Sequence, residues 1–284
     1  DMLRPGVWKL QDYTGSSFYV VEGTRAALVI DTGFGAELVT PWIRKITSLP
    51  LELALTHCHG DHMYHADEFK TVYLSAKEKE PLERMKKTML AGRDIDYDSL
   101  QDIPDGTVID LGGLGIEVME LPGHTPGNAM FWVKKQGIMF TGDHILFDIS
   151  PNITSWLESE DPLGDYLDSL RLVRKYPVRL ALPGHRKTGD YAARIEALLA
   201  HHERRLAETE ALLAEHPGMT AYETAGKMRW KIRADSWEEF PPSQKWFAVG
   251  ECMAHLDYLR LRGRIRREMD GEVWRWFTVT AKYC

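Results

Sequence analysis

The sequence predicts a protein of the α+β class, with stacked sheets and outer helices, followed by a smaller domain of helices and one hairpin. Two observations predict this arrangement. Over residues 1–190, short apolar runs of strand length alternate with helical stretches, and from residue 191 the pattern changes to long helices. A length of 284 residues suits one large domain and one small domain. We therefore predict a main domain at 1–190 and a helical C-terminal domain at 191–284.

The strands of the main domain are predicted from apolar runs that end in Gly or Asp. Residues 17–30 are two such runs separated by Glu22-Gly23-Thr24, which predicts a hairpin. Further strands are expected at 51–55, 71–74, 107–111, 115–121, 129–134, 137–141 and 178–182. Helices are expected at 36–48, 76–90 and 163–176.

The C-terminal domain shows the order helix, helix, helix, hairpin. Residues 191–215 form one long helical pattern, Thr220 can cap a second helix at 221–228, and a third is expected at 243–262. Asp270-Gly271 then joins two strand-like runs, which is a strong hairpin signal. This order is typical of a winged helix.

The composition excludes several classes of protein. Hydrophobic residues make up 44% and charged residues 27%, which is ordinary for a globular chain and excludes global disorder. No apolar run approaches the ~18 residues of a membrane span, so we expect no membrane contact. Only 3 Cys are present, which favours a reducing, cytoplasmic setting over a disulfide framework. The net charge of -7, which comes entirely from residues 1–190, argues against a general nucleic-acid binder.

The densest group of possible metal ligands is His57-Cys58-His59-Gly60-Asp61-His62, directly after a predicted strand. A loop at that place can turn three imidazoles and one carboxylate towards one point. Imidazole and carboxylate suit zinc, and also iron or manganese. The alternative is a polar loop that holds three histidines by chance, which a chain with 11 His makes improbable.

This spacing resembles the His-x-His-x-Asp-His motif of the metallo-β-lactamase superfamily, whose fold is an αββα sandwich. The resemblance covers roughly residues 7–190. The further ligands of that family match His124 in Pro-Gly-His, Asp143 in Thr-Gly-Asp and His185 in a second Pro-Gly-His, each after a predicted strand. Asp31, in Asp-Thr-Gly, matches an acid that supports the metal loop.

The resemblance implies a site for two divalent metal ions, most often zinc, with iron or manganese as alternatives. One ion would be held by His57, His59 and His124. The other would be held by Asp61, His62 and His185, with Asp143 as the bridge. A hydroxide shared by the two ions would attack the substrate, which gives Asp61 and Asp143 a catalytic role.

Three neighbouring residues are weaker candidates. Tyr64 and His65 replace the small pair that usually follows the motif, and either could donate a hydrogen bond to substrate. His144 follows the bridging Asp143 and is a candidate for supporting the metal ligands. Packing under the loop is the alternative for all three. Cys58 lies between two ligands, and its side chain is expected to point away from the metals.

Two functions remain open from the sequence. The ligand set resembles glyoxalase II, lactonases and metallo-nucleases, which implies hydrolysis of a small thioester, ester or lactone. The C-terminal order resembles the extension of the lactamase-like-protein-2 subgroup, which includes a mitochondrial endoribonuclease. A single-strand-specific ribonuclease is therefore the alternative, with RNA phosphates bound by an arginine cluster at Arg260, Arg262, Arg264, Arg266 and Arg267. The acidic balance favours a small-molecule substrate, and the C-terminal domain could form a homodimer contact.

Overall fold

The computed structural model describes residues 1–155, 160–231 and 234–279. Internal contacts divide the chain into two compact units. The first contains Asp1–Pro151 and Val173–Arg194, and the second contains Asn152–Leu172 and Ile195–Cys284. The domain boundary at residue 190 stays a prediction, because this division also assigns residues 152–172 to the C-terminal unit.

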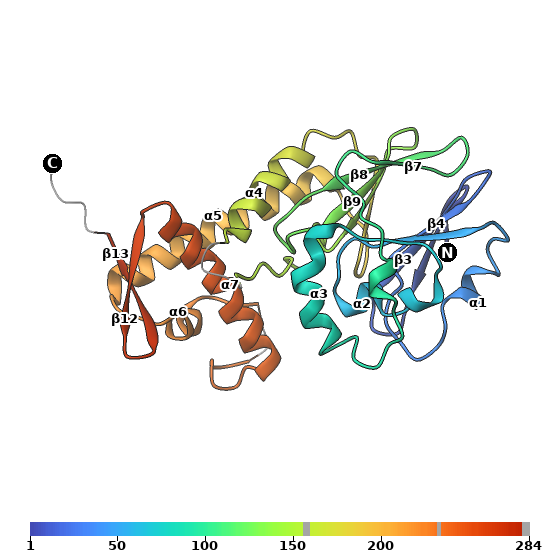
Figure 1. Ribbon diagram of the computed structural model, residues 1–284. Helices are drawn as coiled ribbons and strands as arrows, with labels where there is room; N and C mark the ends of the chain where they lie inside the picture. Colours follow the sequence, from blue (N-terminus) through green and yellow to red (C-terminus); the bar gives the residue numbers. More distant parts are fainter. Residues whose placement is uncertain (156–159, 232–233, 280–284) are drawn as a thin grey trace. The chain divides into compact units, whose positions relative to one another are not determined.

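The first unit contains two sheets, and one of them has six strands in chain order (Figure 1). They are β1 (Met2–Arg4), β2 (Val7–Gln11), β3 (Ser17–Glu22), β4 (Ala27–Ile30), β5 (Leu51–Ala54) and β6 (Val72–Tyr73). Strands β1 to β4 pair antiparallel, and β5 and β6 continue the sheet in parallel. The hairpin predicted at 17–30 is confirmed as β3 and β4. Strands β1 and β2 were not predicted; they lie at the edge of the sheet and are only partly buried.

The other sheet has five strands in the order β11-β10-β9-β8-β7. They are β7 (Val108–Asp110), β8 (Gly115–Glu120), β9 (Ala129–Val133), β10 (Ile138–Gly142) and β11 (Leu180–Pro183). Strand β11 pairs in parallel with β10, and the other pairs are antiparallel. All five were predicted from the sequence, with ends displaced by at most two residues.

Alternating side chains of the six-stranded sheet build two separate cores. Tyr19 and Val21 of β3 face a buried cluster that includes Phe131 and Phe140 of the five-stranded sheet. Phe18, which precedes Tyr19 in the chain, faces a second buried cluster with the helices on the outer side of the sheet. Because both faces of β3 are buried, the strand reads as a continuous apolar run.

The outer helices of this unit are short. They are α1 (Thr40–Ile43), α2 (Gly60–Met63) and α3 (Lys79–Lys86), with the 3-10 helices η1 (Ala66–Glu68), η2 (Ala76–Glu78) and η3 (Tyr97–Ser99). The helix predicted at 36–48 is therefore wrong in length. Pro41 lies in the first turn of α1, and after Ile43 the chain continues to Thr47 in irregular hydrogen-bonded turns.

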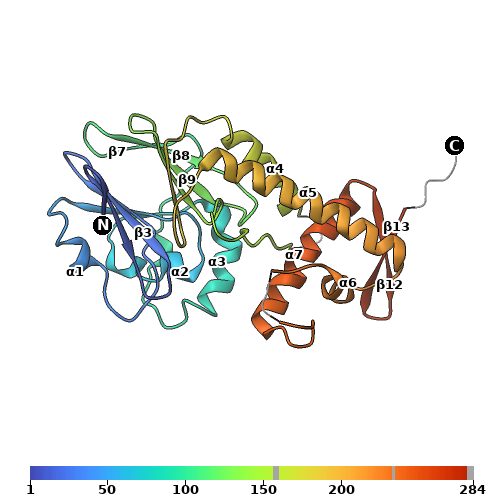
Figure 2. The ribbon, with the colours of Figure 1, turned by 180° about the vertical axis from the view of Figure 1, so that it is seen from behind.

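In the second unit, α5, α6 and α7 followed by a hairpin have the predicted order, and most of α4 belongs to the same unit (Figure 2). Its elements are most of α4 (Pro162–Val173) and of α5 (Tyr191–Glu215), then α6 (Ala221–Lys227), α7 (Pro242–Leu261), β12 (Ile265–Asp270) and β13 (Val273–Thr278). Thr220 and Glu223 form a capping box at the start of α6. Gly271, in the turn of the hairpin, has a positive φ of 62°. Within the described residues, no helix is both long and apolar enough to cross a membrane.

A buried carboxylate joins two loops of the first unit. The side chain of Glu78 is fully buried. Its Oε2 accepts a hydrogen bond from the N–H of Cys58 (2.9 Å), and its Oε1 accepts one from the N–H of Gly127 (2.7 Å). A Cβ at residue 127 would lie 2.7 Å from Ser75 Oγ, so only glycine fits this approach. Glu78 therefore holds the loop after β5 and the loop after β8 in fixed positions.

We predict that Glu78→Gln destabilises the protein by about 2 kcal/mol, because one buried N–H loses its acceptor. The urea midpoint of unfolding measures this. Glu80→Gln is the matched control, since Glu80 is exposed and pairs with Arg84 on the surface; its cost should stay below ~1 kcal/mol. Equal losses in the two variants would contradict the role given to Glu78.

Candidate metal centre

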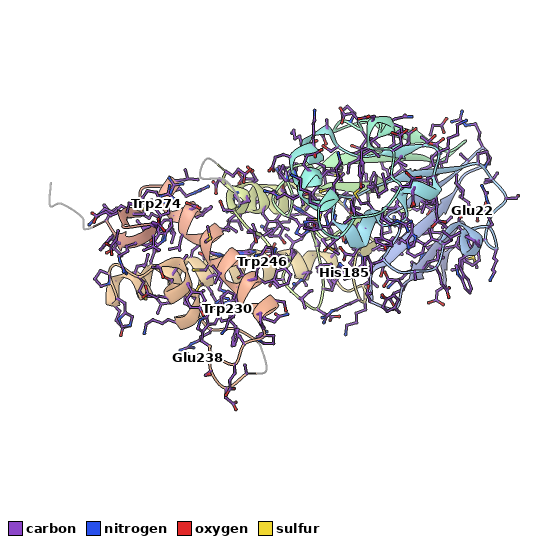
Figure 3. The ribbon with its side chains drawn as sticks, turned by 60° about the horizontal axis from the view of Figure 1, so that its bottom comes forward. Glu22, His185, Trp230, Glu238, Trp246 and Trp274 are labelled. Atoms are coloured by element: carbon purple, nitrogen blue, oxygen red, sulfur yellow. The ribbon has the colours of Figure 1, made fainter. Side chains whose placement is uncertain are left out.

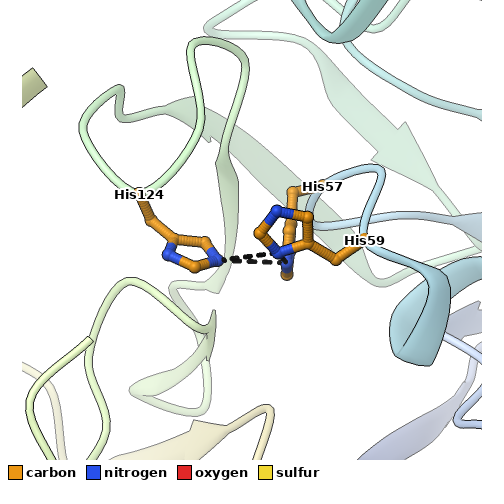
Figure 4. A group of neighbouring side chains, drawn as sticks. All are labelled: His57, His59 and His124. Atoms are coloured by element: carbon orange, nitrogen blue, oxygen red, sulfur yellow. Dashed lines mark hydrogen bonds between the residues drawn. The ribbon is translucent and has the colours of Figure 1, made fainter. Parts of the chain in front are cut away.

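Three imidazoles converge at the ends of two strands (Figure 4). His57 and His59 lie in the loop that follows β5, and His124 lies in the loop that follows β8. His57 Nε2 is 2.9 Å from His59 Nδ1 and 3.3 Å from His124 Nε2. His124 Nε2 is also 3.1 Å from His59 Nδ1. Each of the three rings therefore presents one nitrogen to the same point.

These three nitrogens cannot satisfy one another by hydrogen bonding. A neutral imidazole has one N–H and one acceptor nitrogen, and an N–H can be aimed at only one of the two neighbouring nitrogens. At least one short contact would then join two lone pairs or two N–H groups. A cation bound by all three lone pairs removes this conflict, and three imidazoles suit a divalent transition metal.

A second group of ligand atoms lies beside the first. Asp61 and His62 belong to α2, and His185 follows β11 after one residue. His185 Nε2 is 3.2 Å from Asp61 Oδ2, and His62 Nε2 is 3.8 Å from the same oxygen. These three side chains form a further group that could hold a metal ion.

Asp143, directly after β10, lies between the two groups. Its Oδ1 is 3.5 Å from His62 Nε2, and its Oδ2 is 3.2 Å from His185 Nε2 and 4.0 Å from His124 Nε2. His62 Nε2 and Asp143 Oδ1 are both buried and have no hydrogen-bond partner in the structure. Buried polar atoms normally have a partner. This pair of atoms therefore fits a bound cation.

Gly184 allows the turn that carries His185, labelled in Figure 3, to come close to Asp143 and His62. A Cβ at residue 184 would lie 2.5 Å from Asp143 Oδ1 and 2.6 Å from His62 Cε1. Any larger residue would therefore displace two of the candidate ligands. This steric limit explains why the residue before His185 is glycine.

Asp31 orients two of the histidines. It directly follows β4 and has a positive φ of 61°, a strained conformation for a residue with a side chain. Its Oδ2 is 2.8 Å from His62 Nδ1, and its Oδ1 accepts a hydrogen bond from the N–H of Thr56 (2.8 Å). Thr56 Oγ1 donates to Asp31 and lies 2.9 Å from His57 Nδ1. Because Nδ1 of both rings is occupied in this way, Nε2 of both rings faces the site.

The electrostatic environment differs between the two groups. Burial and the neighbouring imidazoles lower the pKa of His57 well below its usual value, so its lone pair is available. In the second group, burial favours the neutral ring of His185. The carboxylates of Asp143 and Asp61 favour the protonated ring more strongly and raise the pKa of His185 to about 9. Burial likewise opposes the charge of Asp143, yet His62 and His185 hold the pKa of this carboxyl well below its usual range. A divalent cation in the second group would replace these imidazolium protons.

The weaker candidates have other neighbours. The Tyr64 ring lies 4.5 Å from the ring of Phe34, and the guanidinium of Arg93 lies over its face. His65 is buried, with Nδ1 3.0 Å from Glu68 Oε1. These contacts favour the packing alternative for both residues, and their role towards substrate stays a prediction.

Two further sequence expectations concern buried side chains. His144 is fully buried beside the site, and burial lowers its pKa to about 3, so its ring is neutral. A supporting role for this ring stays a prediction. Cys58 packs in the outer core of the six-stranded sheet, as expected.

Two residues at the site were not predicted. Thr56 links Asp31 to His57, and its place directly before the His-x-His motif is a signal that could have revealed it. Ser16, directly before β3, lies 3.3 Å through Oγ from Asp61 Oδ2. Ser16 has no local signal, because 45 residues separate it from Asp61.

Comparison with known proteins agrees with this geometry. Residues 12–185 match the family described as the metallo-β-lactamase superfamily, and residues 238–280 match a metallo-β-lactamase-like C-terminal domain. The β-lactamase-like protein 2 homologue of Caenorhabditis elegans is 24% identical over 242 residues, which cover 81% of this chain and 76% of that protein. An atrochrysone carboxyl ACP thioesterase of Aspergillus terreus is 29% identical over 207 residues, which cover 71% of this chain and 59% of that protein.

Two solved structures are similar along nearly the whole chain. A β-lactamase domain protein from Burkholderia ambifaria has a TM-score of 0.81 and 25% identity, covering 98% of this chain and 93% of that one. A metallo-β-lactamase family protein from Thermus thermophilus has a TM-score of 0.76 and 26% identity, covering 98% and 100%. The two-sheet fold, the grouped histidines and aspartates, and a family match over most of the first unit lead to one conclusion: the chain belongs to the metallo-β-lactamase superfamily of metal-dependent hydrolases.

Proposed function

We propose that this chain is a binuclear hydrolase that cleaves a small acyl thioester, ester or lactone. It would use two divalent metal ions, and zinc is the metal we expect. The position of Asp143 carries the proposal. Its carboxylate faces ring nitrogens of both ligand groups, His124 on one side and His62 and His185 on the other. One carboxylate can therefore hold two cations at once.

The residues around the site have two roles: some orient the metal ligands, and Asp143 would hold both cations. When bound, two metal ions would supply a water with a pKa near ~7 and a Lewis acid for the acyl carbonyl. Asp31 and Thr56 fix the rings of His62 and His57, so the ligand geometry exists before substrate arrives. Asp143 would fix the distance between the two cations.

The exposed side of the site indicates where substrate enters. The side chain of His62 is 1% exposed, whereas those of Asp61 and His185 are 28% and 20% exposed. Solvent therefore reaches the second ligand group across Asp61 and His185. We infer that the acyl group approaches from this side.

One relative supports a thioester substrate, and the burial of Cys58 bears on the nucleophile. The thioesterase of Aspergillus terreus is a relative over 71% of this chain. A direct attack by the protein is disfavoured, because Cys58, the cysteine of the metal loop, is buried in the outer core and burial raises its thiol pKa well above the usual value. An activated water then remains as the nucleophile.

The ion pairs of the C-terminal arginines weigh against the ribonuclease alternative. Each of its five arginines has a carboxylate partner within the second unit. Arg262 Nη1, for example, is 2.8 Å from Asp161 Oδ2, and Arg264 pairs with Glu210. Guanidinium groups that are already paired attract phosphates less strongly. This pairing weighs against a phosphate-binding edge and in favour of a small-molecule substrate.

We predict two metal ions per chain by elemental analysis, and about one in His185→Ala, because that variant loses a ligand of one group only. His216→Ala is the matched control, since His216 lies on the surface; it should keep both ions. A chain without metal, or two ions retained in His185→Ala, would contradict the binuclear site.

We predict that Asp143→Asn lowers kcat more than about 100-fold, because the amide cannot bridge two cations through two oxygens. Circular dichroism should show an unchanged fold. Asp148→Asn, in the same loop and paired with exposed Lys187, should keep activity within about twofold. Full turnover by Asp143→Asn would refute the bridging role.

A substrate panel tests the reaction class. S-lactoylglutathione, a coenzyme A thioester, a homoserine lactone, nitrocefin and single-stranded RNA would be compared at one enzyme concentration. We expect an acyl thioester to show the highest kcat/KM, by about tenfold or more. This activity should be insensitive to salt and unchanged by Arg264→Ala with Arg266→Ala. RNA cleavage that is salt-sensitive and lost in that double variant would instead support the ribonuclease.

A further inference from the structure

Ser16 lies directly opposite His185 in the backbone pairing of the first unit. The two residues form an isolated antiparallel bridge. The N–H of Ser17 donates to the carbonyl of Gly184 (2.6 Å), and the N–H of Arg186 donates to the carbonyl of Gly15 (3.4 Å). Residues opposite each other in an antiparallel bridge place their side chains on the same side. The hydroxyl of Ser16 is therefore brought to the ring of His185 by the backbone.

This hydroxyl contacts two candidate ligands of the second group. Ser16 Oγ is 3.4 Å from His185 Nδ1 and 3.3 Å from Asp61 Oδ2. The side chain is almost fully buried, at 1% exposure, so water does not compete freely for these contacts. One hydroxyl can accept a hydrogen bond from one group and donate one to another.

The proton arrangement follows from the geometry. His185 Nε2 faces Asp61 and Asp143, so a cation bound there must take the lone pair of Nε2. The remaining proton of the neutral ring is then on Nδ1, which donates to Ser16 Oγ. The hydroxyl proton of Ser16 then has two acceptors at 3.3 Å, Asp61 Oδ2 and Thr14 Oγ1, and the charged carboxylate is the stronger acceptor of the two. The contacts of Ser16 with His185 and Asp61 are both satisfied only when Nδ1 of His185 carries a proton.

The loop that carries Ser16 is built around one carboxylate. Asp12 Oδ1 accepts hydrogen bonds from the N–H groups of Thr14 (2.8 Å), Gly15 (2.9 Å) and Ser16 (3.0 Å). Asp12 Oδ2 accepts a further hydrogen bond from the N–H of Phe34 (2.6 Å). Ser16 is therefore held in position by the loop itself, independently of His185.

We propose that Ser16 is a positioning residue that selects the Nδ1–H tautomer of His185 and orients Asp61 for the second cation. This inference rests on the binuclear centre proposed above. Loss of a group that orients a metal ligand typically weakens metal binding by about 10–100-fold. Because the Ser16 contacts are long, we expect the lower end of this range.

The test is a titration of the metal-free protein with Co²⁺, following visible absorption, in wild type, Ser16→Ala and Ser17→Ala. Ser17 is the matched control: it is adjacent, equally buried, and its hydroxyl contacts Gln11. We expect the affinity for the second equivalent of Co²⁺ to fall about tenfold in Ser16→Ala, with the first equivalent unchanged. Ser17→Ala should match wild type, and Ser16→Thr, which keeps the hydroxyl, should restore the second site.

The outcomes separate this inference from the proposed function. A wild-type chain that binds fewer than two equivalents of Co²⁺ would defeat the binuclear centre itself. Two equivalents bound with equal affinity by wild type and Ser16→Ala would overturn the role of Ser16 alone. A weakened second site in Ser16→Thr as well would also overturn it. If Ser16→Ala does not fold, Ser16→Gly removes the same hydroxyl and gives the same comparison.

Discussion

The short separation of three imidazole nitrogens, on His57, His59 and His124, is the constraint on which the site depends. Contacts of 2.9–3.3 Å between them cannot all be hydrogen bonds. The two sheets make the convergence possible. Strands β5, β8, β10 and β11 end at the same edges of their sheets, and each is followed by a loop that contributes a ligand. The polar atoms are therefore collected where the strands stop, while the apolar core fills the space between the sheets.

Rigid support for the ligands comes from carboxylates and hydroxyls outside the ligand set. Asp31 adopts a strained backbone conformation and yet holds both Thr56 and His62. Glu78 connects the loops of the two sheets through buried N–H groups. Ser16 joins the second ligand group from a third loop. Because the rings of His57, His62 and His185 are each contacted at Nδ1, their Nε2 atoms stay directed at the site.

The second unit shows how charges that form a run in the sequence find partners within the fold. In the sequence, five arginines within eight residues predict a basic edge. In the structure these arginines lie at the end of α7, in the turn that follows it and on β12. They form ion pairs with Asp161 directly before α4, Glu210 in α5, Asp257 in α7 and Glu268 on β12. Arg267 also lies over the rings of Trp274 and Trp276. The charges of these arginines are paired with carboxylates of the same unit. This pairing is one reason why we propose a small molecule and not RNA as the substrate.

The sequence alone determined the family, the order of most elements and the seven candidate ligands, because local spacing encodes them: His57, His59, Asp61 and His62 lie within six residues, and each other ligand follows a recognisable strand. Long apolar runs and Asp-Gly turns likewise encode β3, β4 and the C-terminal hairpin. Only the tertiary structure decided which neighbours belong to the site. It gave Tyr64 and His65 packing partners and brought in Ser16, since contacts between distant segments depend on strand pairing, which leaves no local signal in the chain. It also paired the arginines with acids as far as 101 residues away, which the sequence could present only as an uncompensated run of charge.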